Sequence, residues 1–265
     1  MRIYDAPILV LDTETTGVDV STVRIVEIGG ADFEGPFSLG PPFVSRVNPG
    51  EPIPAEASQV HGIYDADVSD APTFSQIAAR LVERVRATPR PVLSGYNFRD
   101  YDGPLLRAEL RRAGLDGDLF DEREALDPII WLRWKFRHWK SRKLADVCER
   151  FGHPLKDAHT AAADAFAAGL VLGSLLFAGE IPDNVEKALR RQDEIVRVLD
   201  EERAAWSHYL YRDRAGSAPK IRIGFGKHVG HALEDVPGPY LRFCLETFGD
   251  DLPPDVRALF LRRIG

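Results

Sequence analysis

Two carboxylates, Asp12 and Glu14, follow the apolar run Ile8-Leu9-Val10-Leu11. An unbroken apolar run of this kind is typical of a strand buried on both faces of an α/β sheet. Side chains two positions apart on a strand point to the same face, so the two carboxylates should lie side by side. Carboxylates that close raise each other's pKa unless a cation offsets their charge, and hard divalent cations prefer oxygen ligands. The pair therefore predicts a divalent-metal site, against the plainer alternative of a strand end with solvated acids.

Three further side chains fall where such a site needs them. Asp102 lies past the end of a predicted strand, at the start of a predicted helix, and Asp164 lies in the first turns of the helix predicted over 160–177. His159 precedes Asp164 by five positions, a spacing that does not put two residues on one helical face. We therefore place His159 in the loop or cap before the helix, from which its imidazole can swing over the four carboxylates.

The acidic residues also form a family pattern. Asp12-Thr13-Glu14, the stretch 97–102 and His159-x-x-x-x-Asp164 together resemble the three motifs of the DEDDh 3′–5′ exonucleases, a family that includes proofreading subunits of replicative polymerases, ribonuclease T and exodeoxyribonuclease X. The resemblance covers about residues 6–178. It implies an RNase H-like α/β exonuclease fold with a five-stranded mixed sheet flanked by helices. Each motif alone is a weak signal, but all three in order at these separations are specific.

The second motif departs from the family pattern, which usually reads His-Asn-x-x-Phe-Asp. Here the stretch is Tyr96-Asn97-Phe98-Arg99-Asp100-Tyr101-Asp102, one residue longer and with tyrosine in place of histidine, a form similar to that of the exonuclease I branch. Asp100 is therefore an alternative to Asp102 as the second-motif ligand. The aromatic residue directly before Asp102 matches the family motif and favours Asp102.

The resemblance implies a ligand set and a mechanism. Two Mg²⁺ or Mn²⁺ ions, about 3.5–4 Å apart, would bind the attacking water and the leaving oxygen of a phosphoryl displacement. Asp12 would bridge both ions, Glu14 and Asp164 would complete one site, and Asp102 would support the other. His159 would accept the proton of the water as general base, because a histidine titrates near neutral pH.

Contacts with the substrate strand are expected from a turn, a loop and a basic aromatic segment. Gly17 would let the backbone approach the terminal nucleotide. His61 and Asn97 have structural alternatives, and for the segment Trp131–Lys143 we weigh a single-strand contact surface against a helix that buries its tryptophans. The candidate substrate-binding residues are Thr15, Thr16, Gly17, His61, Asn97, Trp134, Lys135 and Lys227.

Hydrophobic patterns predict the elements that position these residues. Strands are expected at about 8–11, 23–31, 43–47, 91–97 and 126–129. Helices are expected at about 74–87, 104–113, 143–151 and 160–177.

The chain is expected to contain three parts: an exonuclease domain over 1–180, an amphipathic connecting helix and linker over 181–219, and a small module over 220–265. The helix is expected to continue to about 214, and 215–219 to form the linker. Within the module, Gly224 to Gly230 predicts a short hairpin with Lys227 at its tip, followed by two helices. The stretch 224–243 resembles the small C-terminal domain of exodeoxyribonuclease X-like proteins. Two roles are considered for this module: binding DNA, and a purely structural or protein-binding role.

Bulk composition limits the classes of function. The formal net charge of −7 argues against a protein that coats nucleic acid through bulk electrostatics, but not against an enzyme that meets phosphates through bound metal ions. The N-terminus lacks the pattern of a secretory signal, and no apolar run is long enough to span a bilayer. Cys148 and Cys244 lie far apart, as expected for reduced thiols in a cytoplasmic protein.

These observations favour metal-dependent 3′–5′ hydrolysis of DNA, in repair or proofreading, with 5′-mononucleotides as products. The expected partner is the 3′ end of a DNA strand, single-stranded rather than duplex; no membrane partner is expected and a polymerase or repair partner is left unassigned. The alternatives are a 3′–5′ exoribonuclease similar to ribonuclease T or oligoribonuclease, and a nucleic-acid-binding protein without catalysis.

Overall fold

The computed structural model describes residues 1–86, 91–121, 124–155, 159–206, 209–213, 220–249 and 252–265. The chain divides into two compact units. The first consists of Met1–Trp131 and Ser141–Asp193, and the second of Leu132–Lys140 and Glu194–Gly265. The candidate carboxylates all belong to the first unit.

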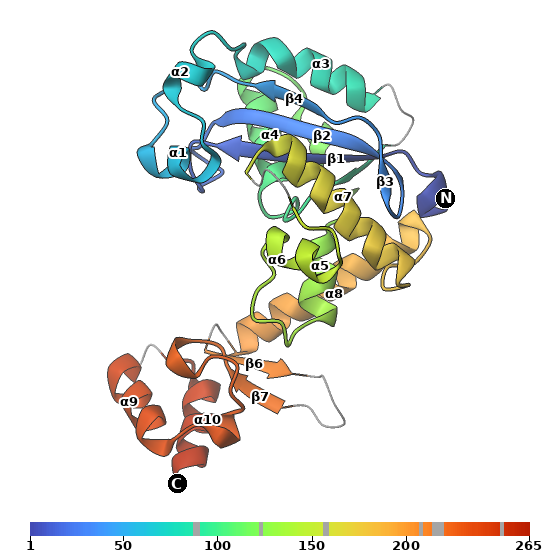
Figure 1. The fold of residues 1–265 in the computed structure, drawn as a ribbon. Helices are drawn as coiled ribbons and strands as arrows, with labels where there is room; N and C mark the ends of the chain where they lie inside the picture. The colour runs from blue at the N-terminus through green and yellow to red at the C-terminus, as the bar shows by residue number, and fades with distance from the viewer. Residues whose placement is uncertain (87–90, 122–123, 156–158, 207–208, 214–219, 250–251) are drawn as a thin grey trace. The chain divides into compact units, whose positions relative to one another are not determined.

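The first unit is built on a five-stranded mixed sheet, as the sequence predicted (Figure 1). Strand β1 (Ile8–Thr15) lies inside the sheet, antiparallel to β2 (Ile25–Gly35) and parallel to β5 (Val92–Ser94). Strands β3 (Ser38–Leu39) and β4 (Phe43–Arg46) both pair with β2 in antiparallel fashion. Because β1 has a neighbour on each edge, its backbone groups are paired and its side chains point to the two helical layers.

Helices cover both faces of the sheet. In chain order they are α1 (Ala55–His61), α2 (Asp65–Val68), α3 (Phe74–Arg86), α4 (Asp102–Arg112), α5 (Pro128–Lys135), α6 (Leu144–Arg150) and α7 (Ala161–Phe177), with short 3₁₀ turns at Ile3–Asp5 and Gly117–Phe120. The four predicted helices correspond to α3, α4, α6 and α7. Within the described residues, no helix is both long and apolar enough to cross a membrane.

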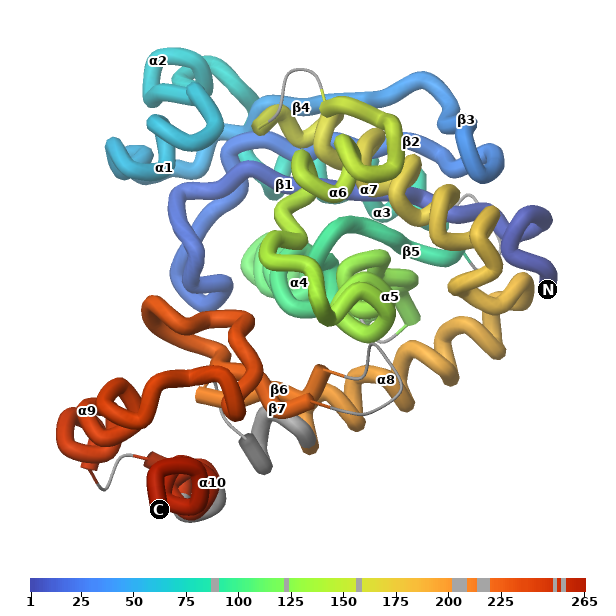
Figure 2. Tube along the Cα trace, turned by 60° about the horizontal axis from the view of Figure 1, so that its bottom comes forward, coloured from blue at the N-terminus to red at the C-terminus, as the bar shows by residue number. Residues whose placement is uncertain are grey.

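Strand β1 delivers its carboxylates to one of these faces. Leu9 and Leu11 belong to the hydrophobic core that α3 and α4 close. Asp12 and Glu14 alternate with them and therefore point to the opposite face. Helix α7 packs along β1 and β2, and α6 packs against α7 (Figure 2). The two carboxylates consequently face the first turns of α7.

The strand predicted at 126–129 is wrong. Only Leu126 pairs there, through an isolated parallel bridge to Ser94, and α5 begins at Pro128. The Asp127 carboxylate accepts the backbone N–H of Ile129 at 3.2 Å, and Pro128 occupies the first helical position. An aspartate N-cap followed by proline is a helix-start signal, and it prevails over the apolar run that follows.

Besides Leu132–Lys140, the second unit contains the part of the long helix α8 (Val185–Trp206) from Glu194 onward. The helix ends before the predicted position near 214, because the chain forms strand β6 (Leu210–Asp213), paired with β7 (Lys220–Ile223). The predicted linker at 215–219 lies outside the described residues. The stretch 224–230 is a loop with a 3₁₀ turn, closed by the Gly230 N–H to the Ile223 carbonyl at 2.8 Å. The two predicted helices are present, as α9 (Gly238–Phe248) and α10 (Pro254–Ile264).

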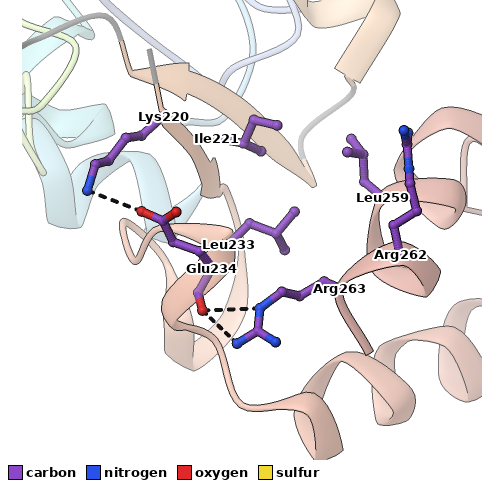
Figure 3. A pocket seen from close by; sticks show the side chains of 7 residues that line it. All are labelled: Lys220, Ile221, Leu233, Glu234, Leu259, Arg262 and Arg263. Carbon is purple, nitrogen blue, oxygen red and sulfur yellow. Dashed lines mark hydrogen bonds and ion pairs between the residues drawn. The ribbon is translucent and has the colours of Figure 1, made fainter. Parts of the chain in front are cut away.

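A pocket of about 380 Å³ lies between β7, the turn at Leu233–Asp235 and α10 (Figure 3). Two of its three basic side chains, Lys220 and Arg263, are already engaged with Glu234. Lys220 lies 3.2 Å from the Glu234 carboxylate, and Arg263 donates to the Glu234 carbonyl at 2.6 Å. The Arg263 contact fixes the last turn of α10 to the turn at Leu233–Asp235, so we assign Lys220 and Arg263 a structural role.

Candidate active site

Three carboxylates of the first unit meet where β1 faces α7. Asp12, Glu14 and Asp164 each offer an oxygen within 4.8 Å of the others. The close approach depends on Gly29, which pairs with Asp12 across β1 and β2. A Cβ at Gly29 would lie 2.4 Å from the carbonyl carbon of Ala161, the first residue of α7. The glycine therefore lets the start of α7, and with it Asp164, pack against the strand pair.

Asp102 is the fourth carboxylate. It is 3 % exposed, it begins α4, and its Oδ1 accepts the Thr13 hydroxyl at 2.6 Å. Burial is the main cause of the raised pKa of Asp12, and repulsion from Asp102 is the next largest. Asp100, by contrast, is exposed. The structure therefore brings Asp102, rather than Asp100, to the other three acids.

Burial and mutual repulsion make this cluster costly in the absence of a cation. Burial raises the pKa of Glu14 to about 8 and that of Asp102 to about 7. Burial, followed by repulsion from the neighbouring acids, raises the pKa of Asp12 well above its usual range, and burial also raises the pKa of Asp164. Oδ1 of Asp164 is buried with no hydrogen-bond partner among the described residues. Hard oxygen ligands with an orphaned carboxylate oxygen fit a divalent cation.

These pKa shifts predict how stability depends on pH and metal. In the folded chain Glu14 and Asp102 keep their protons up to about pH 8 and 7, whereas in the unfolded chain they lose them near pH 4. The stability that these two protonated acids contribute is therefore fully present below about pH 4 and is lost as the pH rises to about 8. In EDTA, thermal denaturation should give a lower melting temperature at pH 8 than at pH 5. Mg²⁺ should raise that temperature more at pH 8, because metal ligands must be deprotonated. A Glu14→Gln chain should show a flatter pH dependence, whereas a metal-free chain that gains stability toward pH 8 would contradict the assignment.

His159 lies in the loop before α7, as the sequence predicted. It directly precedes Thr160, whose hydroxyl caps the helix by accepting the Ala163 N–H. The His159 ring is exposed, and His159 partly offsets the rise that burial gives to the pKa of Asp164, so this residue lies near the cluster. Its backbone has a φ of 69°, in the left-handed region that few non-glycine residues adopt. The local backbone thus holds the histidine beside the carboxylates and open to solvent.

The turn at the end of β1 is held by internal contacts. The Tyr101 hydroxyl donates to the Gly17 carbonyl at 2.6 Å and lies 2.6 Å from Oγ1 of Thr15. Oγ1 of Thr16 accepts the Arg24 N–H at 3.0 Å. Tyr101, which sequence reasoning used only to align the second motif, therefore shapes the turn. The side chains of Thr15 and Thr16 therefore fix the turn, together with the Gly17 carbonyl that accepts from Tyr101.

His61 has a structural role in the same region. It is 8 % exposed, and its Nδ1 accepts the Ile63 N–H at 3.0 Å. Its Nε2 lies 3.2 Å from the Thr15 carbonyl and so carries the proton that it donates. Of the two roles considered for His61, the geometry supports the structural one, in which it supports the Thr15 backbone.

The second motif is fixed by an acid that sequence reasoning missed. Asp127 is 1 % exposed and accepts the backbone N–H groups of Asn97 at 3.0 Å and Arg99 at 3.1 Å. Asn97 adopts a φ of 69°, which asparagine tolerates better than most residues. Asp127 therefore shapes the turn that leads to Asp102. The signal that could have identified it is the Asp-Pro pair, which marks a helix start rather than a strand.

Glu27 is a second missed residue. It lies opposite Glu14 in the sheet and is 3 % exposed. Its Oε1 accepts the Ala161 N–H at 2.9 Å, and its Oε2 lies 2.9 Å from the Arg46 guanidinium. The carboxylate thus ties the N-terminus of α7 to the sheet, where negative charge is favourable. The sequence signal that could have identified Glu27 is a glutamate inside the apolar run of β2.

Glu27→Ala should weaken the site without removing a ligand. Loss of the acceptor leaves the Ala161 N–H buried and unpaired, at a cost of about 1–3 kcal/mol in unfolding free energy. Displacement of α7 should lower metal affinity or activity roughly 10–100-fold. Glu27→Gln, which keeps an oxygen acceptor, should recover most of both. Urea denaturation and Mg²⁺ titration of activity measure the two effects.

Arg84→Ala is the control for Glu27, because it breaks the exposed 2.8 Å pair with Asp32 on the same strand. It should change stability by no more than about 1 kcal/mol. Equal effects of the Glu27 and Arg84 substitutions would contradict the positioning role.

The other candidate contacts belong to the second unit or to the chain entering it. Trp131 is buried, whereas Trp134 is half-buried, with the Arg137 guanidinium 4.7 Å from its ring centroid. Lys135 is exposed at the end of α5, and Lys227 is exposed on the loop after β7. The segment Trp131–Lys143 therefore mixes the two alternatives considered for it.

Comparison with known proteins gives a consistent result. The exonuclease family model RNase T matches residues 9–172. The uncharacterized exonuclease CP81 of Escherichia phage 186 is 32% identical over 168 residues, which are 58% of this chain and 80% of the phage protein. The DNA polymerase III subunit epsilon of Rickettsia felis is 30% identical over 148 residues, 54% of this chain and 61% of that subunit.

A solved structure shows the same fold. Exonuclease I of Escherichia coli, in a zinc-bound complex with single-stranded DNA, matches with a TM-score of 0.58 at 19% identity. The match covers 77% of this chain and 44% of the exonuclease I chain. The expected RNase H-like exonuclease fold with a five-stranded mixed sheet is thereby confirmed.

Proposed function

This chain belongs to the RNase T family of exonucleases, and from that membership we propose that it is a metal-dependent 3′–5′ exonuclease that releases 5′-mononucleotides from DNA. The observation that carries the proposal is the set of four acids around Asp12, in which Oδ1 of Asp164 is buried without a partner. Because all four acids are present, the proposal favours an active enzyme over a binding protein without catalysis.

The four carboxylates have the chemistry to hold two ions. Two Mg²⁺ or Mn²⁺ ions would supply Lewis acidity and a water of lowered pKa. Asp12, Glu14 and Asp164 would hold one of them, since their oxygens converge. Asp102 lies outside that group but interacts with Asp12, so these two residues would hold the other. Asp12 is then the shared ligand.

The remaining residues position the strand and move the proton. His159, exposed beside the acids, would accept a proton from the attacking water as general base. The backbone of Thr15, Thr16 and Gly17 would contact the terminal nucleotide, at an edge supported by His61. Asn97 would orient the second motif.

DNA is the proposed substrate because exonuclease I was solved with single-stranded DNA and a related protein is a DNA polymerase III subunit. Repair or proofreading is the corresponding proposed role. A 3′–5′ exoribonuclease is the second candidate, supported by the name of the RNase T family. A cytoplasmic location is proposed from the two free, buried thiols of Cys148 and Cys244.

The test uses oligonucleotides labelled at the 5′ end: single-stranded DNA, duplex DNA with a free 3′ end, and RNA of the same sequence. With Mg²⁺, 3′–5′ hydrolysis should shorten the labelled DNA stepwise, whereas EDTA should stop the reaction. Immediate release of the labelled nucleotide would show the opposite polarity. Faster hydrolysis of RNA would overturn only the choice of DNA, and no hydrolysis of any substrate with Mg²⁺ or Mn²⁺ would overturn the proposed function.

A further inference from the structure

Aromatic rings and a cation form a continuous surface on the second unit, where the loop after β7 meets α9. His231 lies 5.4 Å from His228 between ring centroids, and His228 lies 4.5 Å from Tyr240. Tyr240 lies 6.4 Å from Phe243, whose side chain is 56% exposed. Nζ of Lys227 lies 5.3 Å from the Tyr240 ring centroid. We call these five residues, together with Arg242, the ring surface.

The ring surface is held in place by the backbone beneath it. Gly226 has a φ of 62°, and a Cβ there would lie 2.3 Å from the Tyr240 hydroxyl. The loop backbone at Gly226 therefore lies close against the Tyr240 hydroxyl. Nε2 of His228 is buried in this contact and has no hydrogen-bond partner among the described residues. The surface is thus a fixed arrangement rather than a chance grouping of exposed side chains.

Phe243 is not part of the hydrophobic core of the second unit. That core includes Leu241 and Cys244, the residues that flank Phe243 on α9, and Tyr240 packs against it. Phe243 instead points its ring to solvent, as its exposure shows. A large apolar ring exposed beside cations is available to a ligand.

The charges favour an anionic ligand. Lys227 and Arg242 are exposed, and within the described part of the chain neither forms an ion pair. The net charge of the chain is −7, so this local cationic character runs against the overall balance. A protein partner would be matched by an apolar centre with few charges, whereas here the Lys227 ammonium lies 5.3 Å from the Tyr240 ring centroid.

From this geometry we propose that the ring surface binds single-stranded nucleic acid. Bases would stack on Phe243 and Tyr240, and phosphates would meet Lys227 and Arg242. A duplex keeps its bases paired and would offer only its phosphates, so the exposed rings select the single strand. The inference rests on the proposed function in one respect, because the strand bound here would be the one that is degraded.

Binding of fluorescent oligo-dT to the full chain in EDTA tests the proposal, with fluorescence anisotropy as the readout. Phe243→Leu should weaken binding roughly 5- to 100-fold, while Phe243→Trp, which keeps a stacking face, should bind at least as tightly as the parent. Lys227→Ala should reduce the slope of log affinity against log salt concentration by about 0.7, the value for one phosphate contact on a single strand. Circular dichroism confirms that each exposed substitution leaves the fold intact.

Matched controls are Phe177→Leu and Lys187→Ala, exposed residues of the first unit, which should bind as the parent does. Parent-like binding by both Phe243→Leu and Lys227→Ala would overturn the proposal and leave the surface to a protein partner. The proposal would also be overturned if these substitutions reduced the affinity for a matched duplex more than the affinity for the single strand. Hydrolysis with Mg²⁺ is scored separately, so a chain that binds but releases no nucleotide contradicts only the proposed function.

Discussion

Replacing Asp12 by asparagine should lower the rate of mononucleotide release by at least about 10³-fold, equivalent to about 4 kcal/mol in the activation barrier. Asp12 is the residue whose pKa responds to all three other acids, so it is the carboxylate that both proposed ions would share. Asparagine keeps the size of the side chain but removes the charge and one strong oxygen ligand. Initial rates at saturating Mg²⁺ measure the loss.

The same substitution should act on stability in the opposite direction. Because burial, followed by repulsion from the other acids, raises the pKa of Asp12, its charge opposes folding when no metal is present. Metal-free Asp12→Asn chain should therefore unfold at an equal or higher temperature than the parent at pH 8, and gain less from added Mg²⁺. Asp100→Asn, an exposed neighbour of Asp102, is the matched control and should keep the activity of the parent. An active Asp12→Asn chain would remove the basis for the metal site.

The parts of the site that follow strand alternation or helix starts could be predicted from sequence. Asp12 and Glu14 share a face because strand side chains have a period of two, and the apolar run before them fixed the strand. His159 could be placed before α7 because a spacing of five does not fit one helical face. The family resemblance implied the five-stranded sheet, although the smallest strand, β3, replaces the one expected at 126–129.

What could not be predicted depends on contacts between residues distant in the chain. Glu27 is 134 positions from Ala161, and no local pattern shows that its carboxylate holds the α7 N-terminus. Asp127 reaches back 30 positions to Asn97. The Gly29 contact is likewise a property of packing, since a glycine in a strand has several possible explanations. Sequence reasoning therefore identified the acids but not the residues that position them.

Replacing His159 by asparagine should lower kcat about 10²- to 10⁴-fold and leave KM nearly unchanged, because a general base acts on the chemical step. The choice of asparagine matters. His159 has a φ of 69°, which asparagine adopts more readily than alanine, so the substitution should preserve the backbone conformation at position 159. The pH dependence of kcat should also change, since the limb that reports the base is lost.

His153→Asn makes the matched control for His159. His153 lies six positions earlier, and its Nε2 is 3.1 Å from the Ser174 hydroxyl. Ser174 lies in the last turn of α7, far from the first turns that carry Asp164. The substitution should leave kcat close to that of the parent. Mg²⁺ affinity should be nearly the same in both variants, because neither histidine is among the four acids. If His159→Asn kept the parental kcat and pH profile, the proton of the attacking water would have another acceptor, while the metal site would stand. Measuring kcat and Mg²⁺ affinity in both variants thus separates proton transfer from metal binding.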